Sequence, residues 1–221
     1  MQVRDIFRRV AGFTVEPDGL VFDIESVEAD EIREDSEYGG VRVKLYAYLG
    51  KARVRIQVDV GVGDAITPGP LSARYPTLLP DFPAPELRVY PRETVVAEKL
   101  QTIVKLGLIN SRMKDYFDLF VLSLEYEFGG HDLSRAIRAT FVRRETPVPG
   151  ELPLGLSRAF ADDTTKQAQW RQFVTRGQLT SGDHPLAVVI ESLEGFLWPP
   201  LEAVARQLEL DRNWPPGGPW T

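Results

Sequence analysis

Alternating apolar and polar residues mark two neighbouring strands in the first half of the chain. The apolar positions are Val41, Val43, Leu45, Ala47 and Leu49 in the first run and Val54, Ile56, Val58 and Val60 in the second. This period of two predicts half-buried strands joined by a tight turn at Gly50 and Lys51. Residues 19–23 and 27–33 predict two further strands, residues 37–40 a turn, and residues 2–10 a short helix.

The hydrophobic period changes from two to the helical value near residue 90. Residues 61–85, rich in Gly and Pro, predict a long loop. Helices are then predicted over 92–106, 112–125, 133–143, 166–174, 186–197 and 201–210, with Pro199 and Pro200 separating the last two. The tail, residues 214–220, is expected to be loosely attached or draped over the surface. The prediction is an α+β fold with a sheet-rich part, 1–90, and a helical part, 91–221.

Composition narrows the chemistry that such a fold can carry. A 221-residue chain with 43% hydrophobic and 26% charged residues is typical of a globular protein. The lack of cysteine excludes disulfides and thiolate metal sites, and two histidines make an imidazole site or a histidine triad a poor hypothesis. Any metal is therefore expected to be a hard cation on carboxylates. The apolar runs are of strand length and no signal pattern opens the chain, which indicates a cytoplasmic protein without a membrane span.

Asp59 is the first candidate for a metal-binding or catalytic residue. It lies at the end of the second alternating strand and faces away from the apolar positions. A carboxylate in this position can hold Mg²⁺ or activate a hydroxyl, and the alternative is a solvated strand residue.

Lys99 falls inside an apolar arc of the helix predicted over 92–106, between Val95 and Ile103. A buried, unpaired ammonium is costly, so the side chain either extends past the core edge to water or reaches an anion. That anion would be a phosphate or a carboxylate in a cleft.

The next helix opens with several charged residues. Asp115 and Asp118 are three residues apart on one face, Arg112 precedes Asp115 by three on the same face, and Lys114 is expected to point to a different side. Acidic residues in a first turn also interact with the helix dipole or cap the helix, which is the alternative for Asp115.

A basic stretch runs through the two alternating strands. Residues 38–58 contain no acid but include Arg42, Lys44, Lys51, Arg53 and Arg55, on a protein of net charge −6. The acidic total argues against a general nucleic-acid coat, but this face could still contact phosphate or RNA. A solvated antiparallel face is the other interpretation.

Four segments together resemble the nucleotidyltransferase AbiEii/AbiGii toxin family. They are residues 38–43, residues 57–64, residues 90–99 and residues 111–118. The resemblance implies a polymerase-β-like nucleotidyltransferase fold, a mixed sheet followed by a C-terminal helical bundle. It also implies a toxin of a toxin–antitoxin pair linked to phage defence, with a cognate antitoxin as partner.

The resemblance further implies roles for individual residues. Asp59 corresponds to a carboxylate that binds Mg²⁺, Lys99 to a lysine that meets the triphosphate, and Asp115 and Asp118 to the motif with a catalytic Asp. Lys114 and Arg112 are expected to bind nucleotide phosphate, and Arg42, Lys44 and Arg55 to contact RNA. The expected substrates are a nucleoside triphosphate and an acceptor hydroxyl, on tRNA for certain members.

One expected motif of the family does not occur in this sequence. The family's Gly-Gly or Gly-Ser turn followed by an Asp-x-Asp strand supplies two metal-binding carboxylates and normally precedes a helix like residues 2–10. Phosphoryl transfer depends on metal ions that neutralise charge, so the first hypothesis is a truncated nucleotidyltransferase, inactive alone. The second hypothesis is a non-catalytic protein that binds nucleotide, RNA or a protein partner.

Overall fold

The computed structural model describes residues 2–15, 17–32, 39–63, 65–77, 81–177 and 184–221. The chain forms two compact units, Met1–Asp64 and Ala65–Thr221, and each is described by itself. The division expected at residue 90 marks the change from strands to helices, whereas the compact units meet at residues 64 and 65. The segment between these two points therefore belongs to the second unit.

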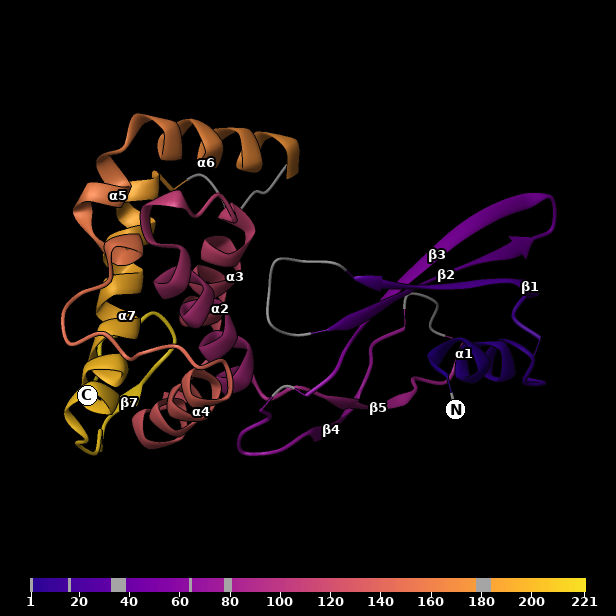
Figure 1. Ribbon diagram of the computed structural model, residues 1–221, viewed down its shortest axis with the longest axis horizontal. Helices are drawn as coiled ribbons and strands as arrows, with labels where there is room; N and C mark the ends of the chain where they lie inside the picture. The colour runs from indigo at the N-terminus through magenta and orange to yellow at the C-terminus, as the bar shows by residue number, and fades with distance from the viewer. Residues whose placement is uncertain (1, 16, 33–38, 64, 78–80, 178–183) are drawn as a thin grey trace. The chain divides into compact units, whose positions relative to one another are not determined.

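The first unit is one helix on a three-stranded antiparallel sheet (Figure 1). Its elements are α1 (Val3–Ala11), β1 (Leu20–Ile32), β2 (Gly40–Leu49) and β3 (Ala52–Gly61), with strand order β1-β2-β3. The β2–β3 hairpin and the helix confirm the predictions, and Gly50 supplies the positive φ, 58°, that the turn requires. Of the turn predicted at residues 37–40, residues 37 and 38 lie outside the described residues.

β1 is one strand where two were predicted. Its pairing with β2 shifts register between Asp23 and Glu28, so the apolar alternation breaks at the bulge and resembles a gap between strands. Ser26 occupies the bulge, where its Oγ donates to the Asp23 carbonyl at 2.6 Å and accepts from the Tyr46 amide at 2.9 Å. These bonds replace the ladder bonds lost at the bulge and keep the strand continuous.

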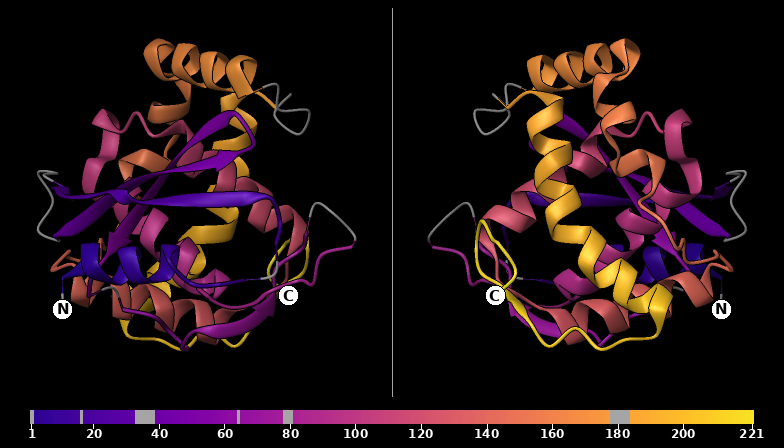
Figure 2. Two further views of the ribbon diagram at one scale, coloured as in Figure 1. Left: turned by 90° about the vertical axis from the view of Figure 1, so that its right-hand side faces the viewer. Right: turned by 90° about the vertical axis from the view of Figure 1, so that its left-hand side faces the viewer.

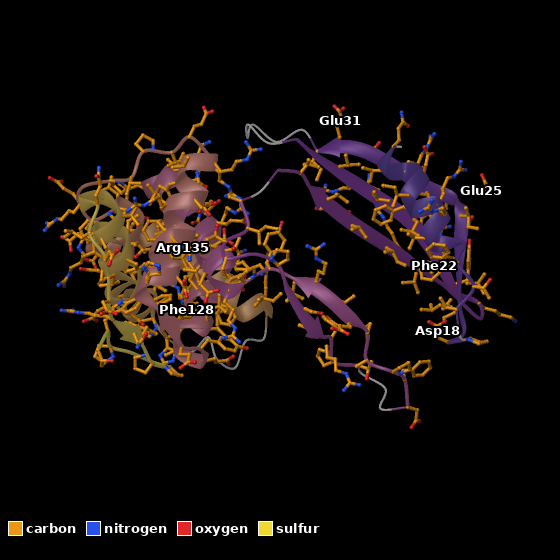
Figure 3. All side chains as sticks on the ribbon, turned by 90° about the horizontal axis from the view of Figure 1, so that it is seen from below. Asp18, Phe22, Glu25, Glu31, Phe128 and Arg135 are labelled. Carbon is orange, nitrogen blue, oxygen red and sulfur yellow. The ribbon has the colours of Figure 1, made fainter. Side chains whose placement is uncertain are left out.

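The apolar face of this sheet forms a small core under α1. Val27, Val43 and Leu45 are buried, and the helix contributes Val3, Phe7 and Ala11 to the same cluster. The opposite face of β2 and β3 carries Arg42, Asp59 and their polar neighbours, as the alternation predicts. Acidic side chains such as Glu25 and Glu31 project from β1 (Figure 3).

The second unit begins with a short hairpin that the sequence did not indicate. Strands β4 (Leu71–Arg74) and β5 (Glu86–Val89) pair antiparallel within and beside the segment predicted to be a long loop. Each strand is four residues long and the intervening residues are rich in proline, which leaves too little alternation to detect. All strand pairs among the described residues are antiparallel, so these residues do not form the mixed sheet that was expected.

Helices form the rest of the second unit around one continuous apolar core. They are α2 (Arg92–Leu106), α3 (Met113–Glu125), α4 (Gly130–Arg143), α5 (Arg158–Asp162), α6 (Thr164–Gly177) and α7 (Leu186–Arg206), with the 3₁₀ turns η1 (Gly107–Ile109) and η2 (Leu154–Leu156). Two-residue strands, β6 (Phe128–Gly129) and β7 (Asn213–Trp214), pair beside them. The α+β class is confirmed. Among the described residues, no helix combines the length and apolar character needed to cross a membrane.

α7 runs unbroken through the two prolines that were expected to divide it (Figure 2). Proline in a helix interior costs about 3 kcal/mol because it removes a hydrogen bond and crowds the preceding turn. On both sides of Pro199 and Pro200 the helix buries apolar residues, among them Phe196, Leu197 and Leu201. The burial of this continuous face outweighs the cost of the prolines, so the prediction of two helices is wrong.

The C-terminal tail is fixed to the helical core rather than loosely attached. Trp214 is buried and its Nε1 donates to the Ser123 carbonyl at 2.8 Å. Trp220 donates from Nε1 to the Phe196 carbonyl at 3.0 Å, and the Phe196 ring lies 4.9 Å from that of Trp214. Each indole N–H thus has an acceptor while its ring is packed against the core, which explains why a Pro- and Gly-rich segment is ordered.

Candidate functional site

Lys99 joins α2 to α3 through two carboxylates. Its Nζ donates to Asp115 Oδ1 at 2.6 Å and to Asp118 Oδ2 at 2.8 Å. The side chains of Lys99 and Asp115 are 18% and 9% exposed, so the contact is largely shielded from water. Of the alternatives left open by the sequence, the lysine reaches an anion, and that anion is a pair of carboxylates.

Two more cations flank the same carboxylates. Arg112 Nε lies 2.9 Å from Asp115 Oδ2, and Lys114 Nζ lies 2.6 Å from Asp118 Oδ2. Lys114 and Asp118 are four residues apart and meet on the helix surface, so the expectation that Lys114 points to a different side is wrong. We call these five residues, Lys99, Arg112, Lys114, Asp115 and Asp118, the Lys99 cluster.

The start of α3 explains how Asp115 becomes available to Lys99. Asn110 Oδ1 accepts from the Arg112 amide at 2.9 Å, and the Asp115 amide donates to the Arg112 carbonyl. Arg112 is the N-cap residue and its side chain makes no capping bond. The two carboxylate oxygens of Asp115, in the first turn of α3, contact the side chains of Lys99 and Arg112.

The cluster holds Lys99 and Asp118 in their charged forms. Burial by itself would lower the pKa of Lys99, but hydrogen bonds and charge from Asp115 and Asp118 raise that pKa above its ordinary value. Burial would raise the pKa of Asp118, yet hydrogen bonds from Lys114 and Lys99 lower it below its usual value. A fixed ammonium with two exposed cations beside it is suited to bind an anion such as phosphate.

An open groove begins at this cluster and runs between the start of α3 and α6. Its volume is about 660 Å³. The α3 side provides residues 111–115, including Asp115, and the α6 side provides Gln169, Gln172, Phe173 and Arg176. We call it the α3–α6 groove.

The four α6 residues were not among the predicted site residues. They follow the spacing i, i+3, i+4 and i+7, which places them on one helix face. That spacing was visible in the sequence, but nothing in the sequence indicated that this face lies opposite the start of α3.

Asp59 sits in the first unit with a partner of its own. Arg42, directly across the hairpin, donates from Nε to Oδ1 at 2.8 Å and from Nη2 to Oδ2 at 2.9 Å. Hydrogen bonding by Arg42 lowers the pKa of Asp59 below its ordinary value. The predicted orientation, away from the apolar face, is confirmed. The convergence of Asp59 with the Lys99 cluster stays a prediction, since the two lie in different units.

The basic face of the hairpin is partly neutralised by acids from β1, which the linear sequence did not show. Asp30 pairs across from Arg42 and its Oδ2 lies 3.2 Å from Lys44 Nζ, while Glu28 is the register partner of Lys44. Of the residues expected to contact RNA, Arg42 and Lys44 thus have carboxylate partners, and Arg55 is exposed. RNA contact by these three residues stays a prediction.

The carboxylates of Asp59, Asp115 and Asp118 do not form a ready Mg²⁺ site. Both oxygens of Asp59 accept from Arg42, both oxygens of Asp115 contact a cation, and Oδ2 of Asp118 contacts two. Within the described ranges, no group of three potential metal-ligating side chains comes together. Magnesium binding at Asp59 therefore stays an expectation from the resemblance.

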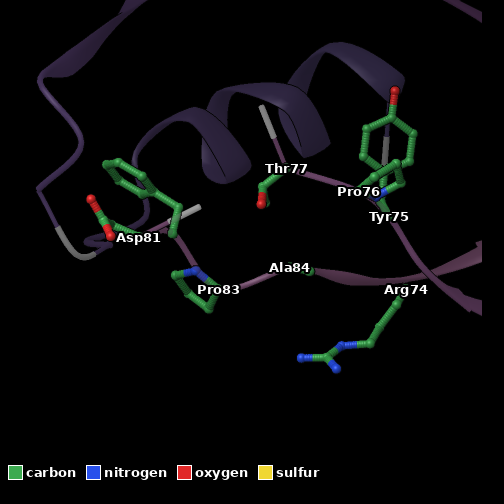
Figure 4. Close-up of a pocket in the computed structure, with 8 residues that line it drawn as sticks. Arg74, Tyr75, Pro76, Thr77, Asp81, Pro83 and Ala84 are labelled. Carbon is green, nitrogen blue, oxygen red and sulfur yellow. The ribbon is translucent and has the colours of Figure 1, made fainter. Parts of the chain in front are cut away.

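A second hollow, of about 610 Å³, lies beyond the β4–β5 hairpin and offers less chemistry (Figure 4). Arg74 and Tyr75 lie at one end and Asp81 at the other, with prolines between them. The charged groups are dispersed rather than gathered, so the Lys99 cluster and its groove form the stronger candidate site.

Fold and site together define an α+β protein in which three cations meet two carboxylates at the mouth of a groove. The family model described as nucleotidyl transferase AbiEii toxin, type IV TA system, matches residues 2–201. The chain belongs to this family of nucleotidyl transferase toxins of type IV toxin–antitoxin systems, and an antitoxin is accordingly implied as its counterpart. No curated protein and no solved structure matches the chain.

Proposed function

We propose that the Lys99 cluster binds the phosphates of a nucleoside triphosphate and serves the transfer of a nucleotidyl group to an acceptor hydroxyl. In such a transfer the acceptor oxygen bonds to the α-phosphorus, pyrophosphate leaves and the hydroxyl releases its proton. The resemblance points to tRNA as the acceptor and to phage defence as the setting. Nucleoside triphosphates are found in the cytoplasm, and we expect the protein to act there.

One observation carries this proposal: three cations converge on two carboxylates at the mouth of a groove. Lys99 is oriented by Asp115 and Asp118 and contributes a fixed positive charge, while Arg112 and Lys114 are exposed enough to turn towards a ligand. Phosphoryl transfer depends on positioning and on charge stabilisation of this kind. Asp115 and Asp118 hold the lysine, and in the proposed reaction they orient the acceptor.

We further propose that the 221-residue chain by itself binds nucleotide but transfers it slowly or not at all. The sequence contains no Gly turn with an Asp-x-Asp strand, and the carboxylates of Asp59, Asp115 and Asp118 each have a cationic partner. Mg²⁺ would accordingly be bound mainly by phosphate oxygens, with Asp59 as the protein ligand that the resemblance implies.

Two measurements on the 221-residue chain test the proposal. The first is calorimetric titration with each nucleoside triphosphate, with and without Mg²⁺, and the second is transfer of labelled nucleotide to bulk tRNA. Lys99→Met should weaken nucleotide binding by at least about tenfold because it removes the central charge. Lys105→Met, a change of the same kind on the exposed side of α2, is the control and should bind like the wild type.

The second hypothesis, a non-catalytic binding protein, is separated from the primary proposal by any labelled product in the same experiments. It expects nucleotide or RNA binding and no labelled product under any condition. Transfer that is lost in Lys99→Met and in Asp115→Asn would rule it out. Unchanged nucleotide binding in Lys99→Met would contradict the primary proposal.

A further inference from the structure

The α3–α6 groove extends beyond the residues that hold Lys99. Asp115 forms part of its wall and also binds Lys99, so the groove opens onto the Lys99 cluster. From there it follows one face of α6 as far as Arg176 and Gly177. Its volume of about 660 Å³ is that of a small-ligand site, enough for about one or two nucleotides.

The groove is positive on an acidic protein. Arg112, Lys114 and Arg176 line it, and the acid in its wall, Asp115, is matched by both Lys99 and Arg112. Arg176 is exposed and makes no ion pair with any residue that the structure describes. Its charge is thus available to a ligand several residues away from the cluster.

The α6 face also offers groups that recognise bases. Phe173 is half-buried and held by the Phe117 ring at 5.8 Å and the Trp170 ring at 5.9 Å, so it forms a fixed aromatic surface. Gln169 and Gln172 line the same wall, and Gln169 Oε1 is buried with no hydrogen-bond partner among the described residues. The amino group of a nucleic-acid base can donate the hydrogen bond that this oxygen does not receive from the described residues.

From this combination we infer that the α3–α6 groove binds the single-stranded 3′ end of an RNA acceptor, a base against Phe173 and phosphates at Arg176 and Lys114. Grooves that bind single strands combine cations for the backbone with aromatic surfaces for bases, and both occur here. A strand bound in this way brings its terminal hydroxyl to the Lys99 cluster. The inference rests on the proposed function, because it assigns the acceptor's place in the same reaction.

Binding of a short RNA to the 221-residue chain tests this without requiring catalysis. The probe is a fluorescein-labelled single-stranded RNA of about eight nucleotides with a free 3′ hydroxyl, followed by anisotropy over a range of salt concentrations. Arg176→Ala should weaken binding about fivefold and reduce the salt slope by about 0.7, the value for one phosphate contact with a single strand. Phe173→Leu, which keeps an apolar side chain, should weaken binding about tenfold through lost stacking.

Arg171→Ala is the matched control for Arg176→Ala. Arg171 is exposed on the same helix, carries the same charge and lines a different hollow, so its loss should change RNA affinity less than twofold. Thermal melts of each variant show whether the fold is kept, and a tenfold loss in Phe173→Leu counts only if its melting temperature is close to that of the wild type.

Three results would overturn the inference. Equal losses in Arg176→Ala and Arg171→Ala would indicate general charge attraction rather than a groove. Equal weakening of nucleotide and RNA binding by Arg176→Ala would assign the groove to the triphosphate. If the wild-type chain does not bind the RNA probe, the proposed RNA site is ruled out. By contrast, groove-dependent RNA binding without nucleotide binding or transfer would contradict the proposed function and leave this site standing.

Discussion

Each of the two units contains an ion pair between an aspartate and a basic residue, but the two pairs differ in their exposure to water. In the first unit Arg42 and Asp59 are 39% and 45% exposed on a sheet surface. In the second unit Lys99 and Asp115 are 18% and 9% exposed between two helices. Water screens the first pair strongly and the second much less, so removing one partner should cost little stability in the first unit and more in the second.

The two units also differ in their cores and in the probes that report on them. The first has a small core of Val27, Val43 and Leu45 with partly buried neighbours, and the second has a continuous core along six helices. All four tryptophans, Trp170, Trp198, Trp214 and Trp220, lie in the second unit. Tryptophan fluorescence therefore follows the unfolding of the second unit alone.

The largest effect is expected from removing the central cation of the cluster. Lys99→Met should destabilise the second unit by about 2 kcal/mol, because it leaves Asp115 and Asp118 as like charges in a partly buried site. For a unit of this size that corresponds to a fall of roughly 4–8 °C in the fluorescence-detected melting temperature.

Lys114→Met is the control for this comparison. It also removes a cation from Asp118, but its side chain is 72% exposed, so the expected loss is at most about 0.5 kcal/mol. Equal losses in the two variants would show that burial does not set the strength of these contacts.

The pH dependence of the Lys99 effect should be smaller and has a defined sign. The pKa of Asp118 is lowered, so its contribution is present above the ordinary value of 3.8 and is lost as pH falls through the lowered value. The pKa of Lys99 is raised, so its contribution is complete below 10.5 and is lost as pH rises through the raised value.

The stability difference between wild type and Lys99→Met should therefore be constant between about pH 5 and pH 9. It should shrink below pH 3.8, where Asp118 becomes protonated first in the unfolded chain and then, at its lowered pKa, in the folded one. Urea unfolding followed by tryptophan fluorescence at a series of pH values measures this difference. A difference that changes steadily across the neutral range would mean that other groups dominate the cluster.

The smallest effect is expected from breaking the exposed pair of the first unit. Arg42→Ala should change the thermal midpoint, followed by circular dichroism, by no more than roughly 1 °C, because surface ion pairs contribute little. The same variant should let the pKa of Asp59 rise towards 3.8, since Arg42 is the main cause of its lowering.

Carboxyl-carbon NMR titration measures that pKa directly. Lys44→Ala is the control, because it removes the partner of Asp30 on the same face. This variant should leave the pKa of Asp59 unchanged. An Asp59 titration unchanged in Arg42→Ala would contradict the contact seen across the hairpin.

Much of the local structure could be read from the sequence because it depends on short-range periodicity. The alternation of residues 41–60 gave the β2–β3 hairpin, and the helical period gave α2 with the bounds observed. Where tertiary packing competes with local preference, the prediction failed. Pro199 and Pro200 lie inside α7 because its buried face outweighs their cost, and the tail is ordered because Trp214 and Trp220 find partners far along the chain.

The sequence by itself determined that Asp115, Asp118 and Arg112 share one helix face and that Lys99 needs an anion, since helical spacing and the cost of a buried charge are local properties. Only the tertiary structure decided that those carboxylates are the anion and that the Gln169–Arg176 face of α6 lies opposite them. The same holds for the acids of β1 that meet the basic hairpin face. Contacts between distant segments depend on how whole helices and strands pack together. The spacing of residues within one segment does not determine that packing.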